Sequence, residues 1–467
     1  MKPKGVFKMH RWEQWGSIFP LVMGVVLVVL SSAVPGTTRA DGGDPNLVHA
    51  CVNPSGLTRI VGPPDPCRPN EETFHWPKPV GPASVEVDCA LGQKIAEALE
   101  SPGNPLTITV KGTCNENVTV ARDTVTLQAD PPASGTVNGP DPALATIRVA
   151  GQDVLIDGLR VTGGRNGIEA VGAVRLLIQN CTVESTGRNG ITFDQGANGV
   201  VDHCTVQNNL FRDGIAVVNG STAIVTRNTI TGNGRRGVHL FQNSNALIGI
   251  TSTSQAAGNT ITDNGGRGIS IVVGSSASIG ANMISRNGTA SNPDASQRGG
   301  VVVFQATADI VGGNTISDNA GSGILVISGN AVVGDPGFIS TSANTITGNG
   351  AGVIMPGFGD GGVFAFQAAS VNIREATING NTGNGVTAQL RSTVQLRGGS
   401  TVNNNTGSGI LMNLGSGLLF DTSVGSITVM GNTVSALLCN LPEASVFPFP
   451  VAASGLAIVG TIICSSF

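Results

Sequence analysis

The chain has 467 residues, of which 66 are glycine, 12% are charged and 4% are aromatic. Val, Ile and Leu remain plentiful, so the composition excludes a disordered chain and indicates many tight turns. The formal net charge of −4 argues against nucleic acid as a partner, because non-specific binding of nucleic acid needs a basic surface.

Residues 1–40 have the pattern of an export signal. A basic start precedes an apolar run from Ile18 to Leu30, and small residues follow as far as Ala40. The run is short for a membrane span, and an uncleaved anchor is the alternative. We therefore expect a bacterial protein that is secreted, extracellular or held in the cell envelope, with no membrane span once the signal is removed.

Residues 41–82 form a Pro-rich segment that contains Cys51, Cys67 and Trp76. A segment of this length has little core, so we expect a small module that depends on a Cys51–Cys67 disulfide and on packing by Trp76. A plain linker is the alternative. The segment resembles small modules that precede repetitive domains in secreted bacterial proteins.

Residues 83–145 are expected to form an N-terminal cap and the first coils of a repeat domain. Apolar residues within 85–100 follow one helical face, with Asp88 placed as a cap, which predicts a helix. An open solenoid end exposes unpaired amides, so a cap is needed there. A Cys89–Cys114 disulfide would hold this helix over the first coil.

Residues 146–436 repeat one short pattern. A Gly followed by a β-branched residue occurs at Gly190, Gly214 and Gly237, in steps of 24 and 23 residues, and the motif N-T-I-[TS] also recurs. Self-similarity at this period is typical of a solenoid, and short β-branched strands exclude helical repeats. The predicted fold is all-β, a single-stranded parallel β-helix.

These motifs resemble the right-handed parallel β-helix repeat of the pectin-lyase-like superfamily, over residues 107–434. The resemblance implies a right-handed coil and leaves the activity open, since the superfamily includes lyases, hydrolases, epimerases and adhesins. Residues 437–467 are expected to form a C-terminal cap or tail. The cysteine spacing suggests that a Cys439–Cys464 disulfide holds this tail, although spacing does not prove connectivity.

Cys181 and Cys204 occupy the position that asparagines occupy in later repeats, so they should lie on adjacent coils. We expect stacked buried thiols, with a disulfide between the two coils as the alternative. The asparagines that follow in this line are Asn228, Asn259, Asn282, Asn314 and Asn344.

The second and fourth residues of the strand after each Gly should point outward. From Val302 to Phe366 this outer face is apolar and includes Phe304. An apolar stripe of this length needs a cover. The chain's own loops at 334–342 and 353–361, or the tail, are the expected cover, with an oligomer contact through Phe304 and Phe366 or a bound ligand as alternatives.

An arginine stands two residues before the Gly in four consecutive coils, at Arg165, Arg188, Arg212 and Arg235. Because Arg binds carboxylates bidentately, this line is the candidate site for an acidic polysaccharide. Arg236 and Arg267 are expected to extend it one residue further along the turn. The alternative is a solvated row of turn residues, partly balanced by Asp194 and Asp213.

Glu169, Asp194 and His239 are expected to project beside the arginine line and are the candidate catalytic residues. Two carboxylates about 8 Å apart would suit an inverting hydrolase. The resemblance also allows a lyase, which could use calcium. The match to known catalytic motifs is poor, and the coils contain no Trp or Tyr for sugar stacking. We therefore predict no cofactor and no metal site, and a binding or structural protein rather than a polysaccharide lyase or glycoside hydrolase, with another envelope protein as an alternative partner.

A line of threonines offers a minor alternative, because regular Thr arrays resemble those of ice-binding solenoids. Thr is also a good strand residue, and Met283 breaks the array. The line comprises Thr182, Thr205, Thr229, Thr260, Thr315, Thr345, Thr377 and Thr401.

Overall fold

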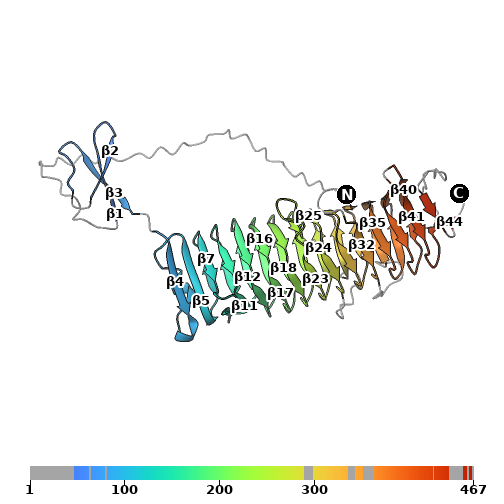
Figure 1. Ribbon diagram of the computed structural model, residues 1–467, viewed down its shortest axis with the longest axis horizontal. Helices are drawn as coiled ribbons and strands as arrows, with labels where there is room; N and C mark the ends of the chain where they lie inside the picture. Colours follow the sequence, from blue (N-terminus) through green and yellow to red (C-terminus); the bar gives the residue numbers. More distant parts are fainter. Residues whose placement is uncertain are drawn as a thin grey trace, which may run out of the picture. The chain divides into compact units, whose positions relative to one another are not determined.

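The computed structural model describes residues 47–62, 65–78, 81–288, 298–334, 342–350, 361–423, 425–440, 456–459 and 462–464. The expected export signal, residues 1–40, lies outside them. The chain forms two compact units, Met1–Pro79 and Val80–Phe467 (Figure 1). No helix among the described residues is long and apolar enough to span a membrane.

The first unit contains a three-stranded antiparallel sheet in the order β2-β1-β3, built from β1 (Leu47–Val52), β2 (Thr58–Val61) and β3 (Glu72–Pro77). The Cys51–Cys67 disulfide is present, as predicted. Trp76 is 41% exposed, so it is not buried in a core, and the packing predicted for it is partial. Trp76 lies on β3, an edge strand, where only β1 can cover one side of it.

The second unit is a stack of coils in which each coil contributes one strand to each of three parallel sheets (Figure 1). We number the sheets by their order along one coil. Sheet 1 comprises β4 (Ala83–Asp88), β5 (Leu106–Asn115), β7 (Val125–Gln128), β10 (Leu155–Asp157), β13 (Leu176–Gln179), β16 (Asn198–Asp202), β19 (Thr222–Thr226), β22 (Asn245–Ile248), β25 (Ser276–Ile279), β28 (Thr307–Ile310), β31 (Asn330–Val333), β34 (Ser370–Ile373), β37 (Thr393–Arg397) and β40 (Gly417–Asp421).

Sheet 2 begins with the end of β5. It continues through β8 (Gly135–Gly139), β11 (Arg160–Gly163), β14 (Thr182–Glu184), β17 (Thr205–Gln207), β20 (Thr229–Thr231), β23 (Thr260–Thr262), β26 (Met283–Ser285), β29 (Thr315–Ser317), β32 (Asn344–Thr347), β35 (Ala376–Asn379), β38 (Thr401–Asn403), β41 (Ile427–Met430) and β43 (Leu456–Ile458).

Within the described ranges, sheet 3 has fourteen strands. They are β6 (Val118–Val120), β9 (Ile147–Val149), β12 (Ile168–Val171), β15 (Ile191–Asp194), β18 (Ile215–Val218), β21 (Val238–Phe241), β24 (Arg267–Val272), β27 (Gly299–Phe304), β30 (Ile324–Ile327), β33 (Gly361–Phe366), β36 (Asn384–Gln389), β39 (Ile410–Asn413), β42 (Leu437–Asn440) and β44 (Ile462–Cys464). At a strand spacing of about 4.8 Å, this stack is roughly 60 Å long. The predicted parallel β-helix is confirmed.

Alternating residues of each strand fill the interior. Ile191 and Phe193 of β15 are fully buried, as the predicted inward pattern requires. The recurring Gly before each sheet 3 strand has a steric cause. At Gly237, a Cβ atom would lie 2.4 Å from Ile261 Cγ2 of the next coil, a distance that side-chain carbons do not tolerate. The repeat therefore keeps Gly because adjacent coils approach too closely there for a side chain.

Two ladders of buried asparagines connect the coils. The predicted ladder lies between sheets 1 and 2, where Asn228 Nδ2 donates to Asn259 Oδ1 at 3.0 Å and the series continues to Asn344. A second ladder, which the sequence analysis did not single out, lies between sheets 2 and 3. Its members are Asn209, Asn233, Asn264, Asn287, Asn319, Asn349, Asn381, Asn405 and Asn432.

Cys181 and Cys204 lie at the head of the first ladder and are free, buried thiols, as predicted. The Cys181 backbone N–H donates to Cys204 Sγ at 3.4 Å, and the Cys204 N–H donates to Asn228 Oδ1 at 2.8 Å. The two sulfurs thus continue the ladder with weaker acceptors. A hydrogen bond with the Cys204 side chain raises the pKa of the Cys181 thiol well above its usual value, and burial raises it further.

The helix predicted over 85–100 is mostly wrong. Val85 and Val87 belong to β4, which pairs in parallel with β5, and helix α1 covers only Ile95–Ala98. The alternation of these two valines suits a strand, and strand pairing decides the outcome. Asp88 does cap a turn, since its side chain accepts a hydrogen bond from the Ala90 N–H at 3.0 Å.

The Cys89–Cys114 disulfide is present, as predicted. Cys439 is also disulfide-bonded, and the pairing of β42 with β44 sets it opposite Cys464. The side chain of Cys464 lies outside the described part of the chain, as do residues 441–455 of the predicted tail. The Cys439–Cys464 bridge therefore stays a prediction.

Candidate functional site

The four arginines of the predicted line occupy equivalent positions in consecutive coils, in the turn that leads into sheet 3. The Arg235 backbone N–H donates to the Arg212 carbonyl of the preceding coil at 2.8 Å. Arg165 and Arg212 are exposed, and Arg188 and Arg235 are half-buried. We call these four residues the arginine line.

No acidic side chain within the described ranges pairs with the arginine line at salt-bridge distance. The neighbouring cations act on one another instead. Burial lowers the pKa of Arg188, and the charges of Arg212 and Arg165 lower it further, whereas Glu169 and Asp213 act in the opposite direction. The line is therefore a row of positive charge that an external anion would stabilise.

A second, buried column lies one residue further along each turn. It contains Asn166, Asn189, Asp213, Arg236 and Arg267. The Asn189 N–H donates to Asn166 Oδ1 at 3.2 Å, and the Asp213 N–H donates to Asn189 Oδ1 at 3.2 Å. The prediction that Arg236 and Arg267 extend the surface line is wrong, since each is only 6% exposed. The shift by one residue turns both side chains away from the arginine line.

Asp213 and Arg236 form a buried ion pair, with Asp213 Oδ1 3.5 Å from Arg236 Nη1. Neither Asp213 carboxylate oxygen has a hydrogen-bond partner among the described residues. Burial raises the pKa of the Asp213 carboxyl and lowers the pKa of the Arg236 guanidinium, while the two charges act on each other in the opposite direction. For both groups, loss of hydration outweighs the pairing.

Of the three candidate catalytic residues, Glu169 and Asp194 lie on adjacent strands, two residues offset as expected, whereas His239 lies apart from Glu169. Glu169 lies opposite Thr192, whereas Asp194 lies opposite Val171, nearer the far end of the strand. Three strand steps separate Glu169 from His239, which corresponds to about 14 Å. Asn166 Nδ2 donates to Glu169 Oε1 at 3.0 Å, and Asn219 Nδ2 donates to Asp194 Oδ1 at 2.7 Å. Each carboxylate thus has its own structural partner, and the catalytic assignment stays a prediction without a shared site.

His239 lies beside the buried column and stacks on Phe241, with ring centroids 5.9 Å apart. Its Nδ1 is buried and has no hydrogen-bond partner in the described ranges. Burial and the nearby Arg236 lower its pKa well below the usual value, while a hydrogen bond with the Ser270 backbone acts in the opposite direction. The imidazole is therefore neutral at physiological pH.

The predicted apolar stripe is a second buried cluster, separate from the main core. Val302, Leu325, Phe364 and Phe366 are 0, 5, 2 and 7% exposed within the single chain. These values agree with the expectation that the chain itself covers the stripe. The two loops expected to cover it, at 334–342 and 353–361, lie largely outside the described residues. An oligomer contact would find little exposed surface on Phe366; Phe304 is half-buried.

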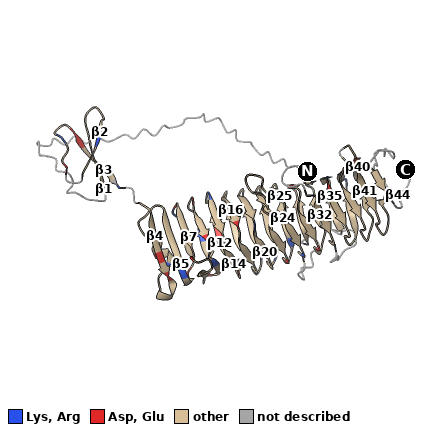
Figure 2. Ribbon diagram, in the orientation of Figure 1, with Lys and Arg blue, Asp and Glu red and all other residues tan. Residues whose placement is uncertain are grey.

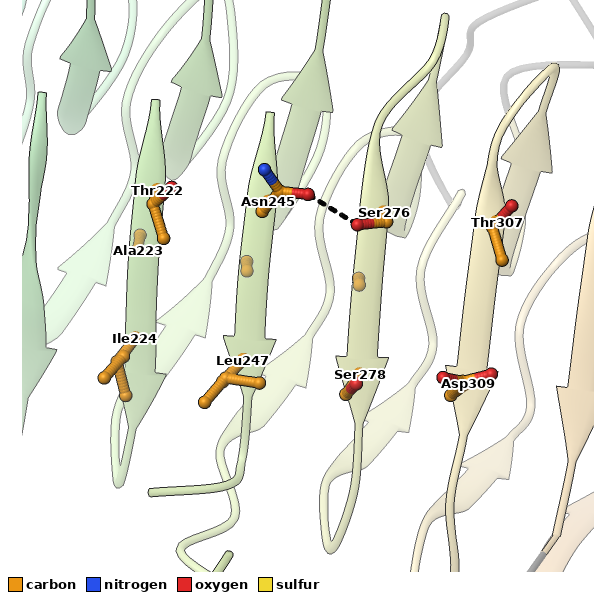
Figure 3. A pocket seen from close by; sticks show the side chains of 11 residues that line it. Thr222, Ala223, Ile224, Asn245, Leu247, Ser276, Ser278, Thr307 and Asp309 are labelled. Carbon is orange, nitrogen blue, oxygen red and sulfur yellow. Dashed lines mark hydrogen bonds between the residues drawn. The ribbon is translucent and has the colours of Figure 1, made fainter. Parts of the chain in front are cut away.

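A feature that the sequence analysis missed lies on the outer face of sheet 1 (Figure 3). A groove of about 300 Å³ crosses β19, β22, β25 and β28, and another of about 460 Å³ crosses β34, β37 and β40. Aligning the first strand of each repeat would have found its lining, since Thr222, Asn245, Ser276 and Thr307 occupy one position. Most residues of the coils are uncharged (Figure 2).

Two groups of potential metal ligands occur within the described residues, and both contain disulfide-bonded cysteines. They are Cys51, Cys67 and Glu71, and Cys89, Cys114 and Glu116. Sulfurs joined to each other do not provide thiolate ligands. Glu116 instead accepts hydrogen bonds from the backbone N–H groups of Ile95 and Ala96 at the start of α1.

The threonine line lies in register on sheet 2, from Thr182 to Thr401, with Met283 between Thr260 and Thr315. Regular pairing of this kind follows from the coil itself. It therefore does not by itself indicate ice binding.

Three parallel sheets, two asparagine ladders and lines of equivalent residues define a β-helix solenoid. The chain belongs to the right-handed beta helix family, whose model, described as the right handed beta helix region, matches residues 145–292 and 292–436. No curated protein matches this chain.

Several solved structures are similar in fold. The pectate lyase Pel9A is 12% identical, with a TM-score of 0.36, over 63% of this chain and 76% of that one. The periplasmic alginate epimerase AlgG is 11% identical, with a TM-score of 0.42, over 72% and 77%. Tailspike protein 3 of bacteriophage CBA120 is 12% identical, with a TM-score of 0.38, over 73% and 57%. At these identities the likeness concerns the fold alone.

Proposed function

We propose that this protein is an exported β-helix protein that binds an acidic polysaccharide through the arginine line. The observation that carries the proposal is a row of positive charge that pairs with no acidic side chain of the described residues; burial lowers the pKa of Arg188, and Arg212 and Arg165 lower it further. Carboxylates spaced along a polymer would relieve this repulsion and could accept bidentate hydrogen bonds. The Cys51–Cys67 and Cys89–Cys114 disulfides are consistent with an oxidising, extracytoplasmic compartment.

The experiment measures binding of the mature chain to polygalacturonate and to alginate by affinity electrophoresis, at low and at moderate salt. We expect retention that weakens as salt rises, because exposed charge pairs are screened. The double variant Arg188→Ala/Arg212→Ala should lose about tenfold or more in affinity, which corresponds to about 1.4 kcal/mol. Arg160→Ala/Arg391→Ala, which also removes two exposed arginines but at positions outside the line, is the matched control.

Equal retention of the double variant and the wild type would contradict the proposal. The same incubations are assayed for new reducing ends and for unsaturated products, with and without calcium. Product that disappears in Asp194→Asn would instead support the enzymatic alternative and would make the binding role secondary.

A further inference from the structure

The groove on sheet 1 is lined by two rows of outward side chains that follow the coil stack. The first row is polar and uncharged over many coils. Its members, which pair in register, are Asn198, Thr222, Asn245, Ser276, Thr307, Asn330, Ser370 and Thr393.

The second row lies two residues further along each strand. It is aliphatic at Val200, Ile224 and Leu247, and then becomes polar at Ser278 and Asp309. Figure 3 shows the two rows crossing the same four strands, with Thr222 to Thr307 nearer the start of each strand and Ile224 to Asp309 nearer its end. The groove thus offers hydroxyl and amide groups along one side and apolar surface along part of the other.

Small inward residues make the floor of the groove. Ala223, Ala246, Ala277 and Ala308 stand between the two rows and are at most 6% exposed. Their side chains point into the core, so the floor itself is backbone. This backbone is already paired, because β22, for example, hydrogen-bonds with β19 on one side and β25 on the other. A peptide strand therefore finds no free sheet edge here to extend.

Among the described residues that line the two grooves there is no Lys or Arg, and Asp309 is the one ionisable group. A polyanion would gain no charge pairing on this face, in contrast to the arginine line. From β19 to β40 the face spans eight strands, or about 34 Å, which suits a polymer better than a small molecule. The polar row matches sugar hydroxyls, which both donate and accept, while the aliphatic row matches the C–H surfaces of sugar rings.

We propose that the outer face of sheet 1 is a second binding site, and that it takes an uncharged, linear polysaccharide lying along the coil stack. This site is distinct from the arginine line and does not depend on it. Its bound chain makes hydrogen bonds with the row from Thr222 to Thr393 and apolar contacts with Ile224 and Leu247. Because no ion pair is involved, binding is insensitive to salt.

The experiment uses affinity electrophoresis of the mature chain in gels that contain mixed-linkage β-glucan, arabinoxylan, galactomannan or hydroxyethylcellulose. The test variant is Thr307→Trp, which places a bulky ring in the groove. The matched control is Thr315→Trp, at the equivalent exposed position of β29 on sheet 2 in the same coil. Circular dichroism and melting temperature show whether each variant keeps its fold.

We expect retention by at least one of these neutral glycans, unchanged by added salt and by Arg188→Ala/Arg212→Ala. Thr307→Trp should change the affinity tenfold or more, because its ring either blocks the groove or stacks on a sugar ring, whereas Thr315→Trp should bind as the wild type does. Asn245→Ala, a milder change in the same row, should weaken binding severalfold if Thr307→Trp proves unstable. Absence of retention by every neutral glycan, or equal binding by the groove variants and the wild type, would overturn the proposal without affecting that for the arginine line.

Discussion

Asn287 Oδ1 accepts two hydrogen bonds from Asn264 of the preceding coil, from Nδ2 at 2.9 Å and from the backbone N–H at 3.2 Å. Asn287 Nδ2 donates in turn to Asn319 Oδ1 at 3.0 Å and to the Ile261 carbonyl at 3.0 Å. One fully buried side chain therefore satisfies groups of both adjacent coils. The second asparagine ladder is a continuous polar connection inside an otherwise apolar stack.

Asn287→Ala should destabilise the protein by about 3 kcal/mol or more, because it leaves several buried groups without partners and each costs about 1–3 kcal/mol. The measurement is thermal unfolding followed by circular dichroism. Asn330→Ala, which removes an exposed asparagine from β31, is the control and should change stability by about 0.5 kcal/mol at most. Equal melting temperatures for the two variants would show that the ladder is energetically unimportant.

The repeat predicted the coils and the first asparagine ladder because equivalent positions of a solenoid lie side by side. It predicted the arginine line for the same reason. It misplaced Arg236, which stands one residue nearer the Gly than Arg235 does, because the spacing shows this shift but does not show that the shift decides between surface and interior. The helix predicted for the segment from Val85 to Val87 was wrong because a short apolar run suits a strand as well as a helix. The polar row that lines the groove on sheet 1 could also have been found in the repeat, because Thr222, Asn245, Ser276 and Thr307 occupy one position, but the sequence analysis did not align this strand.

Cys181 and Cys204 should not react with a thiol reagent in the native protein. They are 1% and 2% exposed, and the raised pKa of Cys181 disfavours its reactive thiolate. The measurement is titration with Ellman's reagent before and after unfolding in guanidinium chloride without reductant. We expect no reaction in the native state and two thiols per chain after unfolding. Four thiols would show that the predicted Cys439–Cys464 bridge is absent, and a rapid native reaction would show that the coils open locally.

The Asp213–Arg236 pair should add little to the net stability of the fold, because the cost of burying the two charges offsets their attraction. Each residue is nevertheless needed to neutralise the buried charge of the other. Asp213→Asn leaves the buried Arg236 charge without a counter-ion, and breaking a buried pair typically costs about 3–5 kcal/mol. The double variant Asp213→Asn/Arg236→Met should recover most of this loss and reach or exceed the wild-type melting temperature. Thermal unfolding of the wild type, both single variants and the double variant measures the coupling. Additive losses in the double variant would contradict a coupled pair.

His239 should make the folded state sensitive to acid. Its folded pKa lies well below 6.5, so the unfolded chain takes up a proton below about pH 6.5 while the folded imidazole stays neutral. Stability rises with pH wherever the unfolded state binds more protons, so this group's contribution is present above about pH 6.5 and is lost as the pH falls, by up to about 1.4 kcal/mol per pH unit. His239→Gln should remove this part of the pH dependence. The measurement compares melting temperatures of wild type and variant at pH 7.5 and 5.5, where the fixed charges of Arg236 and Arg267 are the same. A wild type that loses no more stability than the variant at pH 5.5 would show that the folded state accommodates the imidazolium.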